Sequence, residues 1–146
     1  MQIVLTKEQY EKLMELVYLG NWLVNSYRSD DRIEEYDRMA EHVLSFAPSM
    51  GRQDRVEFDE FEGRYFPSRK FDEELQQNID EYDDDVFWNT LIERLAERDL
   101  IRAQGEEAVN SMSWEEYNRK LEPFLKKYEK EIDDSGVENL EVFKVS

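Results

Sequence analysis

The chain has 146 residues, with 36 acidic and 19 basic side chains, so its formal net charge is −17. That length is typical of one domain. High charge and low hydropathy favour disorder, but 13% of the residues are aromatic, and disordered chains are poor in aromatic residues. We therefore expect a folded domain with an acidic, solvated surface.

The composition also excludes several kinds of site. Because the chain has no Cys, it has no disulfide, no thiolate metal site and no Cys nucleophile. Lys and Arg do not cluster, so we expect no direct binding to nucleic acid or anionic lipid. The first residues do not resemble a signal peptide, and the longest charge-free run, residues 16–27, is shorter than the roughly 20 residues that span a bilayer. We expect a cytoplasmic protein without a membrane segment.

A first helix is predicted to begin at Lys7. Thr6 and Gln9 have the spacing of a capping box, in which each side chain accepts a backbone N–H of the other residue. Over residues 16–27, apolar side chains occur on all sides of the helical wheel, which is typical of a helix surrounded by others. Gly20, which costs about 1 kcal/mol relative to Ala inside a helix, then indicates a close helix crossing.

A second helix is predicted over residues 31–47. Asp31 and Glu34 have the spacing of another capping box, and apolar residues recur after them at helical intervals. Pro48 and Gly51 end this helix. The short connection to the first helix predicts an antiparallel helical hairpin.

Residues 52–70 fit two local structures. Val56 and Phe58 alternate with polar residues as in a short strand, whereas Asp54 and Glu57 are spaced to cap a helical turn. Four aromatic side chains are expected to hold the segment against the core, with an exposed binding loop as the alternative. These four are Phe58, Phe61, Tyr65 and Phe66.

Two apolar stripes occur over residues 69–104, on nearly opposite sides of one helical wheel. The first contains Phe71, Leu75, Ile79, Tyr82 and Val86, and the second contains Trp88, Leu91, Ile92 and Leu95. Three Asp residues, 83–85, lie at the change of phase and are good N-cap residues. We predict two helices, over residues 69–82 and 85–104, the latter closed by Gly105. The alternative is one long helix with a core on each side.

A last helix is predicted to start after Ser113, which has the spacing of a capping box with Glu116. Its apolar face keeps the same phase across Pro123, so we expect a kinked helix, although Pro inside a helix costs about 3 kcal/mol. Residues 140–145 fit either an extended tail or a short strand that pairs with residues 2–5. Together these elements predict a mostly α fold, a compact single-domain bundle of about five helices over the whole chain.

Two pairs of carboxylates are candidates for metal chemistry. Glu8 and Glu11 on the first helix are followed by Glu34 and Asp37 on the second, and the members of each pair are three residues apart. This pattern resembles the metal-binding pattern of the all-α nucleotide pyrophosphohydrolases. The resemblance implies that these side chains hold Mg²⁺ against the phosphates of a nucleotide. Both pairs lie outside the apolar faces of their helices, so the alternative is a solvated position.

Eight acidic residues and no basic residue occur between positions 72 and 85. They are Asp72, Glu73, Glu74, Asp80, Glu81, Asp83, Asp84 and Asp85. One interpretation is a pair of helix N-termini, where acidic groups interact favourably with the helix dipole. A second is a docking surface for a basic protein, because clustered charge attracts partners of opposite sign. A third is a weak Ca²⁺ or Mg²⁺ site, although the alternating ligands and Gly of an EF-hand loop are absent.

Other residues with chemical potential have structural interpretations. His42, the only His, is expected at the boundary of a helix face rather than in a catalytic triad. Core packing is expected for the three Trp residues, Trp22, Trp88 and Trp114, rather than a shared ligand pocket. Arg94, Arg98 and Arg102 form a row at helical spacing beside acidic residues, which is typical of an exposed face of mixed charge.

The sequence therefore predicts no catalytic residue and no cofactor, and it leaves the oligomeric state open. We expect a non-catalytic interaction or regulatory module whose acidic surface binds a basic protein. The alternative is a Mg²⁺-dependent enzyme similar to the all-α nucleotide pyrophosphohydrolases.

Overall fold

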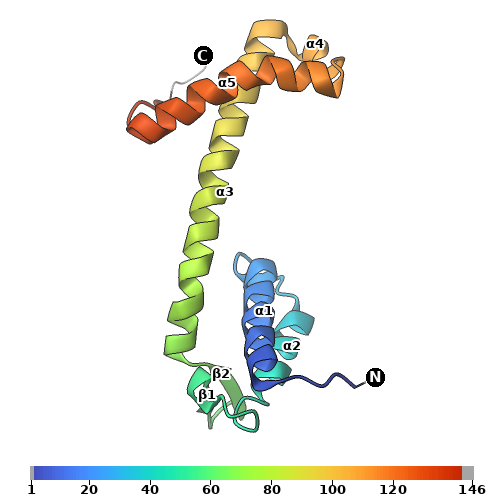
Figure 1. Cartoon of the computed structure of the whole chain (residues 1–146), viewed down its shortest axis with the longest axis vertical. Helices are drawn as coiled ribbons and strands as arrows, with labels where there is room; N and C mark the ends of the chain where they lie inside the picture. The colour runs from blue at the N-terminus through green and yellow to red at the C-terminus, as the bar shows by residue number, and fades with distance from the viewer. Residues whose placement is uncertain (1, 143–146) are drawn as a thin grey trace. The chain divides into compact units, whose positions relative to one another are not determined.

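The computed structural model describes residues 2–142, and over these residues the chain is mostly α-helical, as predicted. Within residues 2–142, helices make up 68% of the structure, and there are five α-helices and one antiparallel pair of strands. Figure 1 shows their arrangement within each part of the chain. The contacts divide the chain into two compact units, Met1–Glu81 and Tyr82–Ser146. That the two units form a single domain stays a prediction.

In the first unit, α1 (Lys7–Asn25) begins where the sequence predicts. The hydroxyl of Thr6 accepts the N–H of Gln9 at 3.2 Å, and the side-chain oxygen of Gln9 accepts the N–H of Thr6 at 3.0 Å. This capping box satisfies two N–H groups that have no partner inside the helix. Tyr10 and Met14, on one face of α1, are buried in the core of the unit.

The prediction that α1 is surrounded by other helices is wrong. Two apolar side chains on its outer side, Leu16 and Leu23, are 68% and 57% exposed, and Tyr27, in the turn after α1, is 72% exposed. A Cβ atom added to Gly20 meets no heavy atom of the described residues within 4 Å, so no neighbouring helix crosses there. Only one side of α1 contributes to the core; the apolar residues on the other side face solvent.

The second helix, α2 (Glu34–Leu44), lacks the predicted capping box. Its N-cap residue is Ile33, and no side chain caps it, because Asp31 pairs with Arg28 at 2.6 Å instead. The buried amide of Asn25 fixes this turn: its oxygen accepts the N–H of Ile33 at 2.9 Å, and its nitrogen donates to the Ile33 carbonyl at 3.1 Å.

The two helices form the predicted antiparallel hairpin. Near the start of α1, the hydroxyl of Tyr10 donates to the carbonyl of Val43, near the end of α2, at 2.6 Å. At the opposite end, Asn25 bonds to Ile33 at the start of α2. The directions of the two chains are therefore opposed.

Within residues 52–70, a β-hairpin over residues 56–67 confirms the strand interpretation. A short 3₁₀ turn (Gln53–Arg55) leads into β1 (Val56–Asp59), which pairs with β2 (Arg64–Pro67) so that Phe58 lies opposite Tyr65. The expectation that all four aromatic residues hold this segment to the core is wrong. Phe61 is 99% exposed at the tip and Phe58 is half exposed, whereas Tyr65 packs against the core.

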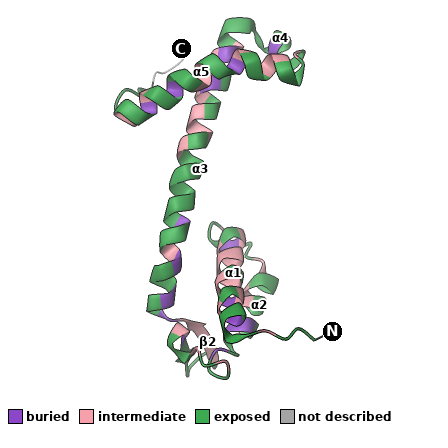
Figure 2. Ribbon diagram, in the orientation of Figure 1, coloured by how far each residue is buried: buried purple, intermediate pink, exposed green. Residues whose placement is uncertain are grey.

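One helix, α3 (Arg69–Gln104), replaces the two that we predicted for this region, and the alternative of a single long helix is correct. The helix needs no break because residues from its two stripes lie in different cores, although Tyr82 and Val86 of the first stripe are exposed. Phe71 and Leu75 belong to the core of the first unit, and Ile92 and Leu95 pack against that of the second. Between them, the middle of α3 is exposed, as Figure 2 shows in green.

The second unit contains the rest of α3, a short helix α4 (Glu106–Asn110) that the sequence did not reveal, and α5 (Trp114–Ser135). Gly105 ends α3 with φ of 85°, as predicted, and α5 continues through Pro123. The buried core of this unit consists of Ala96, Leu100, Val109, Leu121 and Tyr128.

The predicted strand pair of the termini is not present among the described residues. Residues 2–5 and 140–142 form no strand, and the rest of the predicted C-terminal strand, residues 143–145, lies outside the described residues. The only sheet within residues 2–142 is the β1–β2 hairpin.

Candidate functional site

The structure divides the eight acidic residues of positions 72–85 into two groups. Asp72, Glu73 and Glu74, in the first turns of α3, each have a partner within the protein. The partners are Tyr18, Arg69 and Arg55, respectively. These three carboxylates are therefore used in holding the first unit together or in pairing along α3.

The other five acidic residues lie in the exposed middle of α3. None of them forms an ion pair within residues 2–142. The five are Asp80, Glu81, Asp83, Asp84 and Asp85. The interpretation as helix N-termini is wrong for this group, because α3 is continuous there.

These five side chains also repel one another. Asp80 and Asp84, like Glu81 and Asp85, are four residues apart, and like charges at this spacing cost a helix about 0.2–0.5 kcal/mol per pair. Their hydrogen-bond donors are neutral: Gln76 donates to Asp80, and Trp88 donates to Asp84. A group that neutralised this charge would therefore stabilise the helix.

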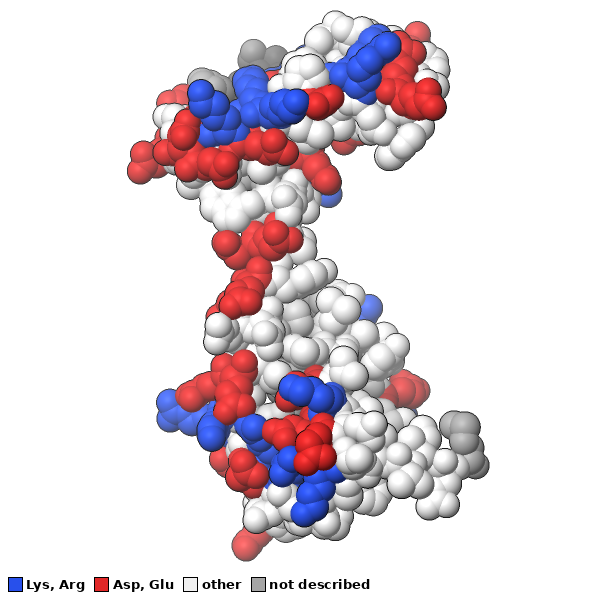
Figure 3. Space-filling model, in the orientation of Figure 1, with Lys and Arg blue, Asp and Glu red and all other residues white. Residues whose placement is uncertain are grey.

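Apolar side chains lie between the charges. Phe87 is 53% exposed, and Asp80, Asp83 and Asp84 precede it by seven, four and three residues, which places all four side chains on the same face. Tyr82 and Val86 are also exposed. We refer to residues 80–87 as the acidic segment; Figure 3 shows acidic side chains along the middle of α3 on the face in view.

The four carboxylates that resemble a Mg²⁺ site are not assembled as one. Both oxygens of Glu11 are held, one by Arg52 at 2.8 Å and one by Arg55 at 2.7 Å. Asp37 pairs with Arg32 at 2.6 Å, and the hydrogen bond from Arg32 lowers the pKa of Asp37. In the part of the chain that the structure describes, no three His, Cys, Asp or Glu side chains are placed to hold a metal ion.

The two remaining carboxylates of that pattern, Glu8 and Glu34, interact with residues near them in the sequence. Glu8, in the first turn of α1, is solvent-exposed, and hydrogen bonds from its own backbone and from Thr6 lower its pKa. Glu34, at the start of α2, lies 3.8 Å from Arg38. The four carboxylates therefore share the sequence spacing of the pyrophosphohydrolase pattern. Among the described residues, they do not come together around one metal position.

The first unit has a cavity of about 440 Å³ between α1, α2 and β2. Tyr18 and Trp22 of α1 and Phe66 of β2 contribute to its wall. Apolar walls with a few polar groups are typical of small-molecule sites. Here, however, the polar groups bind one another: Asn21 donates to Asp37 at 2.9 Å and accepts from Asn25 at 2.9 Å. This network links α1 to α2, and we assign it to stability.

A second polar cluster links α3 to α5 in the second unit. The carboxylate of Asp99 accepts hydrogen bonds from the hydroxyl of Tyr128 at 2.5 Å, from Arg98 at 2.9 Å and from Lys127 at 3.1 Å. Burial raises the pKa of Asp99, but these hydrogen bonds outweigh it and lower the pKa to about 2. Because its donors come from both helices, Asp99 acts as a clamp between them.

The clamp predicts a specific loss of stability in acid. The folded-state pKa of Asp99 is below the ordinary value of 3.8, so its contribution is complete above about pH 4 and is lost as the pH falls toward 2. We expect this contribution to be about 1–2 kcal/mol, since solvent screens a pair near the surface. Unfolding by urea between pH 2 and pH 5 should show a weaker acid dependence in Asp99→Asn than in the unsubstituted chain. The exposed Asp133→Asn should not differ from it.

Sequence reasoning missed both Asn25 and Asp99. The signal for Asn25 was available, because it lies 11 residues after Met14 and thus on the same buried face of α1. Asp99 had no such signal, because its main donor, Tyr128, is 29 residues away in the sequence. The row of Arg residues does pair with acidic side chains, since Arg98 and Arg102 both approach Asp99.

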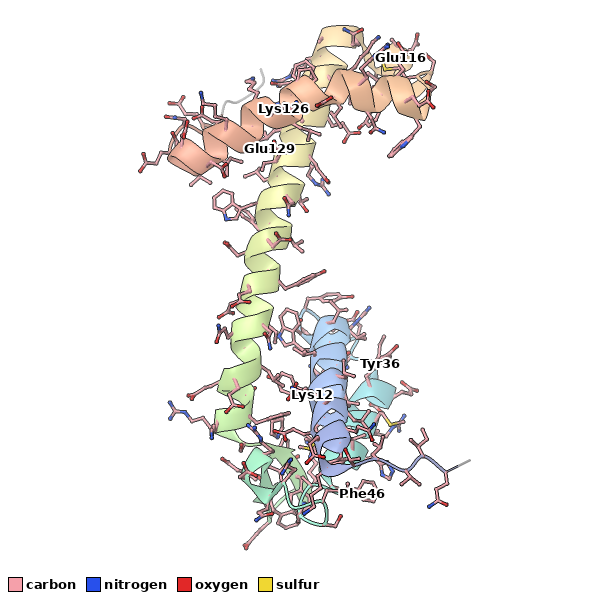
Figure 4. The ribbon with its side chains drawn as sticks, in the orientation of Figure 1. Lys12, Tyr36, Phe46, Glu116, Lys126 and Glu129 are labelled. Carbon is pink, nitrogen blue, oxygen red and sulfur yellow. The ribbon has the colours of Figure 1, made fainter. Side chains whose placement is uncertain are left out.

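The His and Trp residues do not come together as a site. His42 is exposed, and its ring packs edge-on against Phe46, which is labelled in Figure 4. Trp22 and Trp88 are partly buried. The prediction of core packing is wrong for Trp114, which is 76% exposed and stacks on Tyr117.

The chain matches no known protein family, no curated protein and no solved structure. Among the described residues, we find no helix with the length and apolar character needed to cross a bilayer. Functional conclusions therefore depend on the side chains themselves.

Proposed function

We propose that this chain is a non-catalytic interaction module that binds a basic protein through the acidic segment of α3. The observation that carries the proposal is the absence of any ion pair, within residues 2–142, for the five carboxylates of this segment. By contrast, two of the three acidic residues at the start of the same helix form ion pairs, Glu73 with Arg69 and Glu74 with Arg55.

The repulsion among these carboxylates favours a role in binding a cationic partner over a role in solubility alone. Five like charges within six residues of one helix destabilise it, and no tertiary contact of residues 80–87 buries a side chain to offset this cost. Lys or Arg residues of a partner relieve the repulsion when they bind. The same charge attracts such a partner at long range and raises the rate of encounter.

The apolar residues of the segment supply contact area. Phe87, Tyr82 and Val86 are 53%, 55% and 40% exposed. Aromatic residues are enriched in the centres of interfaces, where charged pairs alone add little affinity because their desolvation is costly. The partner that fits best is a helix or extended segment with both Lys or Arg and apolar side chains.

The proposal is tested with a synthetic helical peptide of Lys and Leu, whose affinity is measured by fluorescence anisotropy at low and high salt. We expect binding to weaken by about tenfold or more in high salt, because the Debye length falls from about 10 Å at 0.1 M to about 3 Å at 1 M. A variant with the five acidic residues neutralised should lose about as much. Its substitutions are Asp80→Asn, Glu81→Gln, Asp83→Asn, Asp84→Asn and Asp85→Asn.

A matched control has the same net charge but keeps the acidic segment. It neutralises five exposed acidic residues elsewhere that form no ion pair among the described residues. Its substitutions are Glu106→Gln, Glu107→Gln, Asp133→Asn, Asp134→Asn and Glu138→Gln. We expect this control to bind nearly as the unsubstituted chain does. Equal losses in the two variants would indicate attraction to overall charge alone and would contradict the proposal.

A further inference from the structure

Most of the wall of the cavity between α1, α2 and β2 is apolar. Its volume of about 440 Å³ lies within the range of about 300–1,000 Å³ that is typical of small-molecule sites. Aliphatic side chains of both helices contribute to the wall. Four aromatic residues also line it, which are Tyr18, Trp22, Tyr65 and Phe66. The cavity therefore offers a ligand both space and apolar contact area.

The charged residues that line the cavity neutralise one another. They are two Arg and two acidic residues, so their charges sum to zero. Arg32 pairs with Asp37 at 2.6 Å, and Arg64 lies 3.7 Å from Glu41. A charged ligand would have to displace one of these pairs or be buried without a partner, and burying an unpaired charge is costly. The lining therefore favours an uncharged ligand, although the whole chain has a net charge of −17.

The amide groups of the lining are also occupied. Asn21 donates to Asp37 at 2.9 Å and accepts from Asn25 at 2.9 Å, and Asn25 is bonded to the backbone of Ile33. A ligand that competed for these groups would break the links between α1 and α2. Recognition is therefore expected to depend on shape and on the aromatic rings, more than on hydrogen bonds.

Two of the aromatic rings are held in place by contacts within the first unit. The ring of Tyr18 packs edge-on against Phe71 at 5.9 Å between centroids, and its hydroxyl donates to Asp72. The guanidinium of Arg64 lies 4.6 Å from the centroid of Phe66. Walls that are fixed before binding lose less conformational entropy when a ligand enters. Aromatic walls also prefer planar rings, which pack offset-stacked or edge-on against them.

We propose that the cavity of the first unit binds a small, uncharged aromatic molecule. This site is separate from the acidic segment, because its lining residues all lie between Met14 and Pro67. Binding of an uncharged molecule does not depend on screening of charge, whereas binding of a basic protein does. Failure of one proposal is therefore distinguishable from failure of the other.

The class of ligand is tested by nuclear magnetic resonance titration of the isotope-labelled full chain with three probes. The probes are indole, the saturated and uncharged cyclooctanol, and the anion of an indole carboxylic acid. We expect indole to cause saturable shifts at residues around the cavity, equally at low and high salt. Indole should bind about three- to tenfold more tightly than cyclooctanol, because only its ring interacts with the aromatic walls as an aromatic pair. The anion should bind more weakly than indole.

Three results would each overturn the proposal. The first is the absence of saturable shifts around the cavity up to the solubility limit of indole. The second is equal affinity for indole and cyclooctanol, which would indicate an apolar space without preference for aromatic rings. The third is tighter binding of the anion than of indole.

Substitutions in the wall locate the site. Trp22→Leu removes an aromatic ring but keeps an apolar side chain, so it should weaken indole binding about three- to tenfold and leave cyclooctanol binding nearly unchanged. The matched control, Trp88→Leu, alters a partly buried Trp of the second unit outside this cavity and should change neither affinity. Equal effects of the two substitutions on indole binding would contradict the assignment of the site.

A cavity-filling variant gives a second, independent result. Ala40 of α2 lines the cavity and is half-buried, so the larger side chain of Ala40→Leu occupies part of the space. We expect both uncharged probes to bind at least about tenfold more weakly, while dispersed amide signals show that the chain stays folded. Undiminished binding of indole to this folded variant would place the ligand elsewhere and overturn the proposal.

Discussion

Phe71→Ala is expected to lower the free energy of unfolding of the first unit by about 3–5 kcal/mol. The ring of Phe71 is 1% exposed, packs edge-on against Tyr18 at 5.9 Å between centroids and lies 5.8 Å from the guanidinium of Arg55. Truncation leaves a cavity where α3 enters the core. It also removes the aromatic ring against which the guanidinium of Arg55 packs, and Arg55 pairs with Glu11.

The measurement is urea unfolding followed by circular dichroism, combined with amide hydrogen exchange. We expect α1 and α2 to lose protection in Phe71→Ala. Phe61→Ala is the control, because that ring is 99% exposed and its removal should change stability by less than about 0.5 kcal/mol. A loss of similar size in both variants would contradict the burial of Phe71.

The second large effect is expected for Leu100→Ala, at about 2–5 kcal/mol in the second unit. Leu100 is 1% exposed within a core that includes Val109 of α4 and Leu121 of α5. Since the surrounding helices cannot collapse fully into the space, both the transfer free energy and the contacts of the side chain are lost. Leu140→Ala, at a partly exposed position, is the control and should have a small effect.

Hydrogen exchange in these two variants also tests whether the chain is one domain. If Leu100→Ala weakens protection in α1 and Phe71→Ala weakens it in α5, the chain unfolds as one cooperative unit, as the sequence predicts. If each substitution affects only its own unit, Met1–Glu81 and Tyr82–Ser146 fold separately. The two cores share helix α3 but no core residue.

Local signals in the sequence were sufficient for several elements. The capping box of Thr6 and Gln9 fixes the start of α1, because its donors and acceptors are three residues apart. Gly105 ends α3 because only a residue without a side chain adopts positive φ without strain. The continuous apolar face across Pro123 was a correct sign that α5 does not break there.

Other features depended on contacts between residues far apart in the sequence. The predicted cap at Asp31 is absent because Arg28 holds that carboxylate while Asn25 satisfies the turn. The phase change in residues 69–104 predicts a break, yet α3 is continuous because one part of the helix packs in the core of the first unit and another part in that of the second. A helical wheel shows which side is apolar, but it does not show how many cores that helix enters.

The acidic residues show the same division. The sequence by itself determined that positions 72–85 hold eight acidic residues and no base, that the chain is mostly helical and that no Cys chemistry is available. Only the tertiary structure decided that Asp72 and Glu74 have partners far away in the sequence, Tyr18 and Arg55, while the acidic segment has no ion pair among the described residues. The physical reason is that charge is a property of each residue, whereas its neutralisation depends on which distant side chains the fold brings within reach.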